Sequence, residues 1–224
     1  MLPKVIVHNE ISLDGSIKGF EPNIRRYYEI AARYRPDIVL VGSITAKTGI
    51  ETYVKDVPPE EKNDFIKPEI QLDDKRPFWA IPDTRGTLKN LLHVFRRGDY
   101  CKDIIILVSK STPSSYLNYL KERNYDHIIV GEDHVDYQKA FELLCKSYNC
   151  KIILTDSGGK LNNILLERGL VDEISLLISP ILAGNKYRLF KSLKMKDRSG
   201  KLRLLKNEVI DDNYVLLVYK ISKQ

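Results

Sequence analysis

Short runs of consecutive hydrophobic residues recur along the chain, separated by stretches in which hydrophobic residues fall at helical spacing. The runs predict buried strands over residues 4–11, 38–41, 78–81, 103–108, 127–130, 152–154 and 174–178. The stretches between them predict helices, among them 23–34, 114–123, 137–147 and 161–168. Strands that alternate with helices form a largely parallel sheet flanked by helices.

The last two hydrophobic runs, 202–210 and 214–222, follow each other across a short polar turn. This spacing predicts an antiparallel hairpin that closes the sheet. Both alternating sets of side chains in 214–221 are largely hydrophobic, so both faces of the hairpin need cover, and a second subunit would provide it. The sequence predicts one α/β domain over 1–224, with a mixed, mostly parallel sheet and a C-terminal antiparallel hairpin.

Residues 52–77 interrupt this pattern. They combine prolines at positions 58, 59 and 68 with a dense mix of charges. We interpret the segment as a surface excursion with a helical turn near 60–65.

The composition narrows the class of protein. Of the 224 residues 43% are hydrophobic, which is typical of a globular chain, and no hydrophobic run is long enough to span a bilayer. The three cysteines are odd in number and lack close pairs, so we expect reduced thiols in a cytoplasmic protein that has no membrane partner. The net charge of +6 suits phosphorylated ligands. Its basic residues are scattered, which does not favour nucleic acid as the main partner.

A glycine turn stands between a predicted strand and a predicted helix at 155–161. Gly158 and Gly159 follow Ser157 there, just before the helix begins. Free backbone N–H groups and the positive end of the helix dipole favour an anion at such a place, and glycine lets a phosphate come close. An ordinary turn is the alternative interpretation.

Other predicted strands end in polar residues too. Asn9, Ser12 and Asp14 lie at the end of the first strand, at the edge where α/β sheets bind ligands; the alternative for Asp14 is that it holds an Asp-Gly turn. Gly42 ends the second strand, and we expect Ser43 to cap the next helix. Ser109 and Lys110 end the fourth strand, where an anion site and ordinary helix capping are both open.

The sequence lacks the motifs that are typical of metal sites, of nucleophilic catalysis and of common nucleotide-binding loops. The four histidines are isolated and match no metal spacing, so no metal site is expected. The nucleophile elbow, the Walker phosphate loop and the Gly-x-Gly-x-x-Gly dinucleotide fingerprint are all missing from the sequence. Polar strand ends of this kind suit two large polar ligands bound side by side.

Five motifs, in order along nearly the whole chain, carry a resemblance to a known family. They are Asn9-x-x-Ser12-Leu13-Asp14-Gly15, Val41-Gly42-Ser43-Ile44-Thr45, Thr155-Asp156-Ser157-Gly158-Gly159-Lys160-Leu161-Asn162, Gly169-Leu170-Val171-Asp172-Glu173-Ile174 and Ser179-Pro180-Ile181-Leu182-Ala183-Gly184. The chain resembles the riboflavin-biosynthesis reductases. These are the stand-alone 2,5-diamino-6-ribosylamino-4(3H)-pyrimidinone 5′-phosphate reductases and the C-terminal reductase domain of the bacterial deaminase-reductase. They share a dihydrofolate-reductase-like fold.

The resemblance implies an oxidoreductase that uses NADPH to reduce the ribosylamino group of a diaminopyrimidine 5′-phosphate to ribitylamino, and it implies a homodimer. The residues it assigns to the cofactor are Gly42, Thr45, Ser109, Lys110, Ser157, Gly158, Gly159 and Leu161. The residues it assigns to the substrate are Asn9, Ser12, Asp14, Pro180 and Gly184. Asp14 is the candidate catalytic residue, which would orient the substrate or relay a proton.

Two departures from the family pattern leave alternatives open. The family usually has Glu-Gly-Gly where this chain has Asp156-Ser157-Gly158, and its Asp-x-Pro-x-Leu-Thr run is missing from residues 47–52. One alternative is a reductase of the same fold that acts on another pterin or pyrimidine. The other is a non-catalytic protein that binds a nucleotide or nucleic acid.

Overall fold

The computed structural model describes residues 2–71, 73–190, 193, 201–211 and 213–222. The chain forms two compact units. Unit 1 comprises Met1–Pro3 and Asp37–Lys151, and unit 2 comprises Lys4–Pro36 and Ile152–Gln224. That the whole chain acts as one domain stays a prediction.

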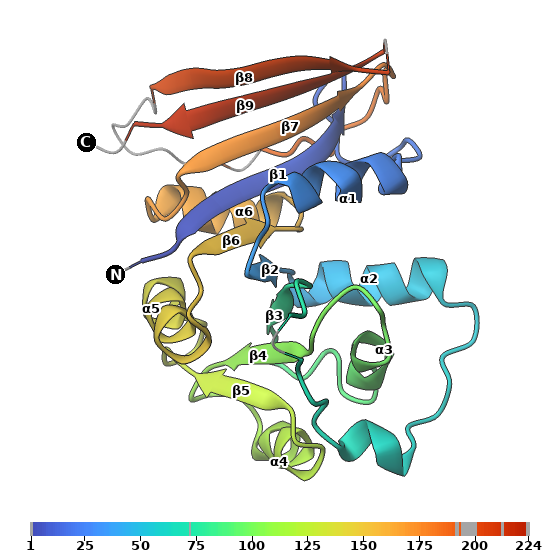
Figure 1. The fold of residues 1–224 in the computed structure, drawn as a ribbon, viewed down its shortest axis with the longest axis vertical. Coiled ribbons are helices and arrows are strands. Elements are labelled where there is room, and N and C mark those ends of the chain that lie inside the picture. Colours follow the sequence, from blue (N-terminus) through green and yellow to red (C-terminus); the bar gives the residue numbers. More distant parts are fainter. Residues whose placement is uncertain (1, 72, 191–192, 194–200, 212, 223–224) are drawn as a thin grey trace. The chain divides into compact units, whose positions relative to one another are not determined.

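In unit 2 the strands of the sheet follow the order β6-β1-β7-β9-β8 (Figure 1). β1 (Lys4–Ser12) pairs in parallel with β6 (Ile152–Thr155) and with β7 (Glu173–Ser179). β9 (Tyr214–Ile221) pairs antiparallel with β7 and with β8 (Leu202–Ile210). The C-terminal hairpin is therefore confirmed.

The two helices of unit 2, α1 (Ile24–Arg33) and α6 (Gly159–Glu167), cover opposite faces of this sheet. Successive side chains of a strand point to opposite faces. On β1 the buried ring of His8 stacks on Tyr27 of α1 at 4.5 Å, whereas Oδ1 of Asn9 accepts a hydrogen bond of 2.8 Å from Nδ2 of Asn162 in α6. One strand thus anchors both helices.

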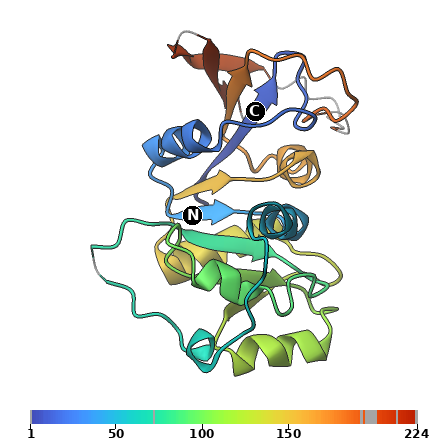
Figure 2. The ribbon, with the colours of Figure 1, turned by 90° about the vertical axis from the view of Figure 1, so that its right-hand side faces the viewer.

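Unit 1 holds a parallel sheet in the order β5-β4-β3-β2 (Figure 2). Its strands are β2 (Ile38–Leu40), β3 (Phe78–Pro82), β4 (Ile104–Val108) and β5 (Asp126–Ile129). Its helices are α2 (Ser43–Tyr53), the 3-10 turn η1 (Lys62–Phe65), α3 (Leu92–Arg96), α4 (Ser114–Glu122) and α5 (Tyr137–Tyr148). Buried hydrophobic side chains of the sheet pack against α2, α3 and α4 on one face.

The strand orders within the two units confirm the predicted fold class, a mixed, mostly parallel sheet with helices and a C-terminal antiparallel pair. The expected cap at Ser43 is wrong. Gly42 is the N-cap of α2, in an extended conformation (φ −64°, ψ 141°), and Ser43 is already the first helical residue. The helix therefore begins one residue earlier than a cap at Ser43 would allow.

The excursion at 52–77 is tied to the body of unit 1. Its first residues belong to α2, and the expected helical turn is present as η1. Glu60 accepts hydrogen bonds from Tyr119 (2.6 Å) and from Nε of Arg123 (2.9 Å). Asp64, which is 5% exposed, pairs with Arg97 at 2.6 Å, and that guanidinium holds the pKa of Asp64 below its usual range. Buried charges, rather than a hydrophobic stripe, hold this segment in place.

Candidate functional site

The glycine turn of unit 2 lies where the sequence predicts it. β6 ends at Thr155, Gly158 is the N-cap of α6 (φ −74°, ψ 179°), and Gly159 is the first helical residue. The first N–H groups of a helix have no intrahelical partner, and the helix dipole makes this end positive. The apolar side chain of Leu161 is buried, so this residue could bind an anion only through its backbone N–H. The arrangement is suited to a phosphate group.

The two glycines serve different purposes. A Cβ on Gly159 would lie 2.4 Å from the carbonyl oxygen of Leu189, a backbone atom that has little freedom to move. A Cβ on Gly158 would meet Cδ1 of Ile17 at 3.7 Å, an ordinary contact. Packing within the chain therefore requires glycine at 159, whereas Gly158 leaves room beside the turn.

Buried amide groups fix the turn. Nδ2 of Asn9 donates to the carbonyl oxygen of Ser157 at 2.9 Å, and Nδ2 of Asn162 donates to the same oxygen at 2.8 Å. Oδ1 of Asn162 accepts from Oγ1 of Thr155 at 2.9 Å. Asn9 was predicted to line the substrate pocket, and here its amide holds the turn. Asn162 is not among the predicted site residues. The sequence feature that could have identified it is a polar residue on the buried face of the predicted helix.

Asp156 stands where the family usually has glutamate. Its two carboxylate oxygens accept hydrogen bonds from neighbouring tyrosines of α1, Tyr27 at 3.0 Å and Tyr28 at 2.9 Å. The sequence did not reveal this contact, because Tyr27 and Tyr28 lie 129 and 128 residues from Asp156 along the chain.

The Asp14 carboxylate has four partners in the protein. Ser12 donates to it at 2.5 Å, the backbone N–H groups of Ala183 and Gly184 donate at 3.0 and 3.1 Å, and Arg188 pairs with it at 2.9 Å. These donors, the Ser12 hydroxyl above all, lower the pKa of Asp14 to about 2. Asp14 is therefore ionised around neutral pH.

The Asp14 contacts join two loops of unit 2. The loop after β1 and the segment 180–188 also exchange backbone hydrogen bonds, from Leu13 N–H to Ile181 O (2.8 Å) and from Ile17 N–H to Tyr187 O (2.9 Å). Pro180 and Gly184 lie exposed on that segment. The structure thus brings Ser12, Asp14 and Gly184 together, and that they border the substrate stays a prediction.

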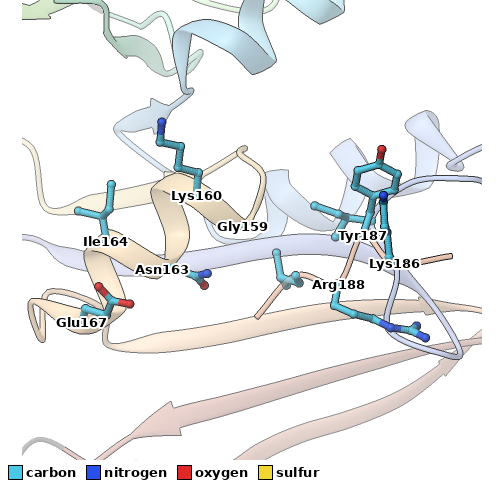
Figure 3. Close-up of a pocket in the computed structure, with 10 residues that line it drawn as sticks. Gly159, Lys160, Asn163, Ile164, Glu167, Lys186, Tyr187 and Arg188 are labelled. Atoms are coloured by element: carbon cyan, nitrogen blue, oxygen red, sulfur yellow. The ribbon is translucent and has the colours of Figure 1, made fainter. Parts of the chain in front are cut away.

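A cavity of about 660 Å³ opens between α6 and residues 186–189 (Figure 3). Gly159, Lys160 and Asn163 line it from α6, and Lys186 and Tyr187 line it from the facing segment. Oδ1 of Asn163 is buried and, within the described residues, has no hydrogen-bond partner. Of the predicted site residues, Gly159 is the one that borders this cavity.

In unit 1, Gly42 and Thr45 lie half-buried at the N-terminus of α2. Ser109 and Lys110 follow β4. Ser109 is fully buried: its N–H donates to Oγ1 of Thr112 (3.0 Å) and its hydroxyl to the carbonyl of Asp133 (3.3 Å). Of this pair, Lys110 is the side chain that reaches the surface.

The predicted cofactor residues fall into two groups. Those in unit 1 are Gly42, Thr45, Ser109 and Lys110, and those in unit 2 are Ser157, Gly158, Gly159 and Leu161. Among the described residues, no three His, Cys, Asp or Glu side chains are placed to hold a metal ion. In the same part of the chain, no helix is both long and hydrophobic enough to cross a membrane.

In each unit the predicted ligand residues lie at the carboxyl ends of parallel strands or on the helix starts that follow. This is where α/β proteins bind nucleotides. The family model of the RibD C-terminal domain matches residues 3–216. The chain belongs to this family, which comprises pyrimidine reductases of riboflavin biosynthesis.

The relatives agree with this assignment. The chain is 24% identical over 195 residues to the 2,5-diamino-6-ribosylamino-4(3H)-pyrimidinone 5′-phosphate reductase of Aquifex aeolicus, covering 81% of this chain and 79% of that protein. A pyrimidine reductase-like protein of Corynebacterium diphtheriae has a similar fold (TM-score 0.72, 18% identity, 99% and 93% of the two chains). So does the riboflavin biosynthesis reductase of Saccharomyces cerevisiae (TM-score 0.61, 21% identity, 99% and 90%).

The close approach at Gly159 gives a testable prediction. We expect Gly159→Ala to lower the free energy of unfolding by about 1–3 kcal/mol, because the new methyl group must displace backbone at Leu189. Gly158→Ala is the matched control and should cost less than about 1 kcal/mol. Urea denaturation of both variants measures the difference. Equal losses would contradict the distinction between the two glycines.

Proposed function

We propose that this chain uses NADPH to reduce the ribosylamino group of a diaminopyrimidine 5′-phosphate to ribitylamino. Membership of the riboflavin reductase family supports the class of reaction. The name of the Aquifex aeolicus relative supports the substrate.

The observation that carries the cofactor assignment is the turn before α6. Its helix N-terminus suits a diphosphate, and Gly158 leaves space for one to approach. The residues proposed to hold the cofactor there are Ser157, Gly158, Gly159 and Leu161, through backbone N–H groups. In unit 1, the residues proposed for the cofactor are Gly42, Thr45 and Lys110, the last of them for the adenosine 2′-phosphate. When bound, NADPH supplies the hydride.

The protein's own task is placement. We assign Asp14 to positioning, because an ionised carboxylate that already accepts from Ser12, Ala183 and Gly184 has little freedom to exchange a proton near neutral pH. Through these bonds it holds the exposed segment 180–184, the proposed border of the substrate. Correct alignment of hydride donor and acceptor is a large part of catalysis for such a reaction.

The reaction is tested directly with the purified protein, NADPH and the ribosylamino pyrimidine phosphate. We expect NADPH oxidation, followed by absorbance, together with a product heavier by two hydrogen atoms in mass spectrometry. Dihydrofolate in place of the pyrimidine is the control. Oxidation with dihydrofolate alone would mean a same-fold reductase of another substrate. Dinucleotide or RNA binding without any turnover would mean a non-catalytic binding protein.

Asp14→Asn separates positioning from proton relay. If Asp14 positions the segment 180–184, the KM of the variant for the pyrimidine rises about tenfold, because the hydrogen bonds to the charged carboxylate are weakened. Its kcat and the shape of its pH profile stay nearly unchanged. Asp56→Asn removes the same charge from an exposed site in unit 1 and serves as control. A collapse of kcat with an altered pH profile would assign Asp14 to proton transfer instead.

We also propose a homodimer. One face of the β8–β9 hairpin is buried under α1, where Leu216 and Val218 pack with Ile30. The opposite face carries Leu204 and Val209, which are 48% and 67% exposed. We expect light scattering to give twice the mass of the chain at micromolar concentration, and Val209→Glu to shift it toward the monomer. A monomeric parent protein would refute this.

A further inference from the structure

Two loops meet after β4 and β5 in unit 1. The N–H groups of Lys110 and Ser111 donate to the carbonyl oxygens of Gly131 (3.1 Å) and Glu132 (3.0 Å). A Cβ on Gly131 would lie 2.0 Å from the carbonyl oxygen of His134, so only glycine fits there. The backbone of Glu132 is therefore held against the 109–112 loop.

The backbone of this loop has little left to offer an anion. The N–H of Ser109 goes to Thr112 and that of Thr112 returns to Ser109 O, so all four N–H groups of 109–112 have partners in the protein. Recognition of a charged ligand here depends on side chains. On residues 109–112 and 131–133, all of them described, Lys110 is the cationic side chain, and Glu132 and Asp133 are the acidic residues.

Lys110 is already paired. Its Nζ lies 2.7 Å from Oε1 of Glu132, and the two side chains are 69% and 76% exposed. An ion pair this exposed is weak and opens readily. The carboxylate nevertheless stays close when the pair opens, because the loops fix the backbone of Glu132.

We infer that Glu132 is a specificity residue that weakens the preference of this protein for NADPH over NADH. The inference rests on the proposed function, which places the adenosine ribose of the cofactor at Lys110. A 2′-phosphate there gains the ammonium but also meets a neighbouring carboxylate. The free 2′-hydroxyl of NADH instead gives that carboxylate a hydrogen-bond donor, the way acidic residues recognise NAD in nucleotide-binding folds. The chain accepts both cofactors as a result.

The test compares kcat/KM for NADPH and NADH in the parent protein and in Glu132→Gln. We expect the ratio of NADPH to NADH to rise about 3- to 10-fold in the variant, and the rise to shrink at high salt, because exposed charges are screened. Glu142→Gln removes the same charge from an exposed position of α5 and should leave the ratio unchanged. Lys110→Gln should lower the ratio, and Glu132→Gln should raise it again on that background, because the carboxylate acts on the ribose directly.

The outcomes distinguish this inference from the proposed function. If neither dinucleotide binds or turns over in the parent protein, the proposed function fails. If the parent protein uses a dinucleotide but Glu132→Gln changes the ratio no more than Glu142→Gln does, the role of Glu132 is refuted. A parent protein that rejects NADH outright would refute it as well. Binding titrations by nicotinamide fluorescence give the same comparison without the pyrimidine substrate.

Discussion

The hydrogen bonds that tie Asn9 of β1 to the turn after β6 fix the geometry on which unit 2 depends. The carbonyl oxygen of Ser157 accepts from both Asn9 and Asn162, and both amides are buried. A buried polar group left without its partner costs about 1–3 kcal/mol, so this turn has one strongly favoured arrangement. The N-terminus of α6 is thereby held at the end of the sheet before any ligand arrives. Such preorganisation lets a helix start serve as a phosphate site without ordering a loop at the moment of binding.

The same strand carries polar residues toward its other face as well. Glu10, 7% exposed, accepts from the N–H of Asn23 at the start of α1 and from the hydroxyl of Ser179 (2.6 Å). His8 is fully buried beside Tyr27, and this burial lowers its pKa to about 4, which keeps the ring neutral. A central strand that ends in buried polar residues on both faces departs from hydrophobic alternation. Here that departure marks the end of the sheet where helices, turn and loops are joined.

The sequence predicts those features of the fold whose interactions lie within a few residues of each other along the chain. Hydrophobic runs and nearby caps act within a few residues, and the strands, the hairpin and the Asn23 cap of α1 were predictable for that reason. Asn9 and Ser157 lie 148 residues apart, and the clamp of Glu60 by Arg123 spans 63 residues. The sequence shows such groups but not their pairing, so it predicts the surface excursion and its helical turn but not the ion pairs that tie the segment to unit 1. The burial of Ser109 was hidden in the same way, because it depends on the neighbouring strand's loop.

The acidic residues at the strand ends share one property: each is already matched by donors of its own unit. Asp14 is held by Arg188 and backbone N–H groups, Asp156 by two tyrosines, and Glu132 by Lys110. A carboxylate bound in this way stabilises a loop or sets local charge, and with a pKa of about 2 Asp14 is far from the range of a general acid at neutral pH. The described strand ends are therefore consistent with the proposed function, in which the protein aligns its ligands and the cofactor supplies the hydride. For the proposed hydride transfer, alignment of the donor and acceptor carbon atoms is a large part of catalysis, and the proton that completes the reduction would come from water or from a group other than Asp14.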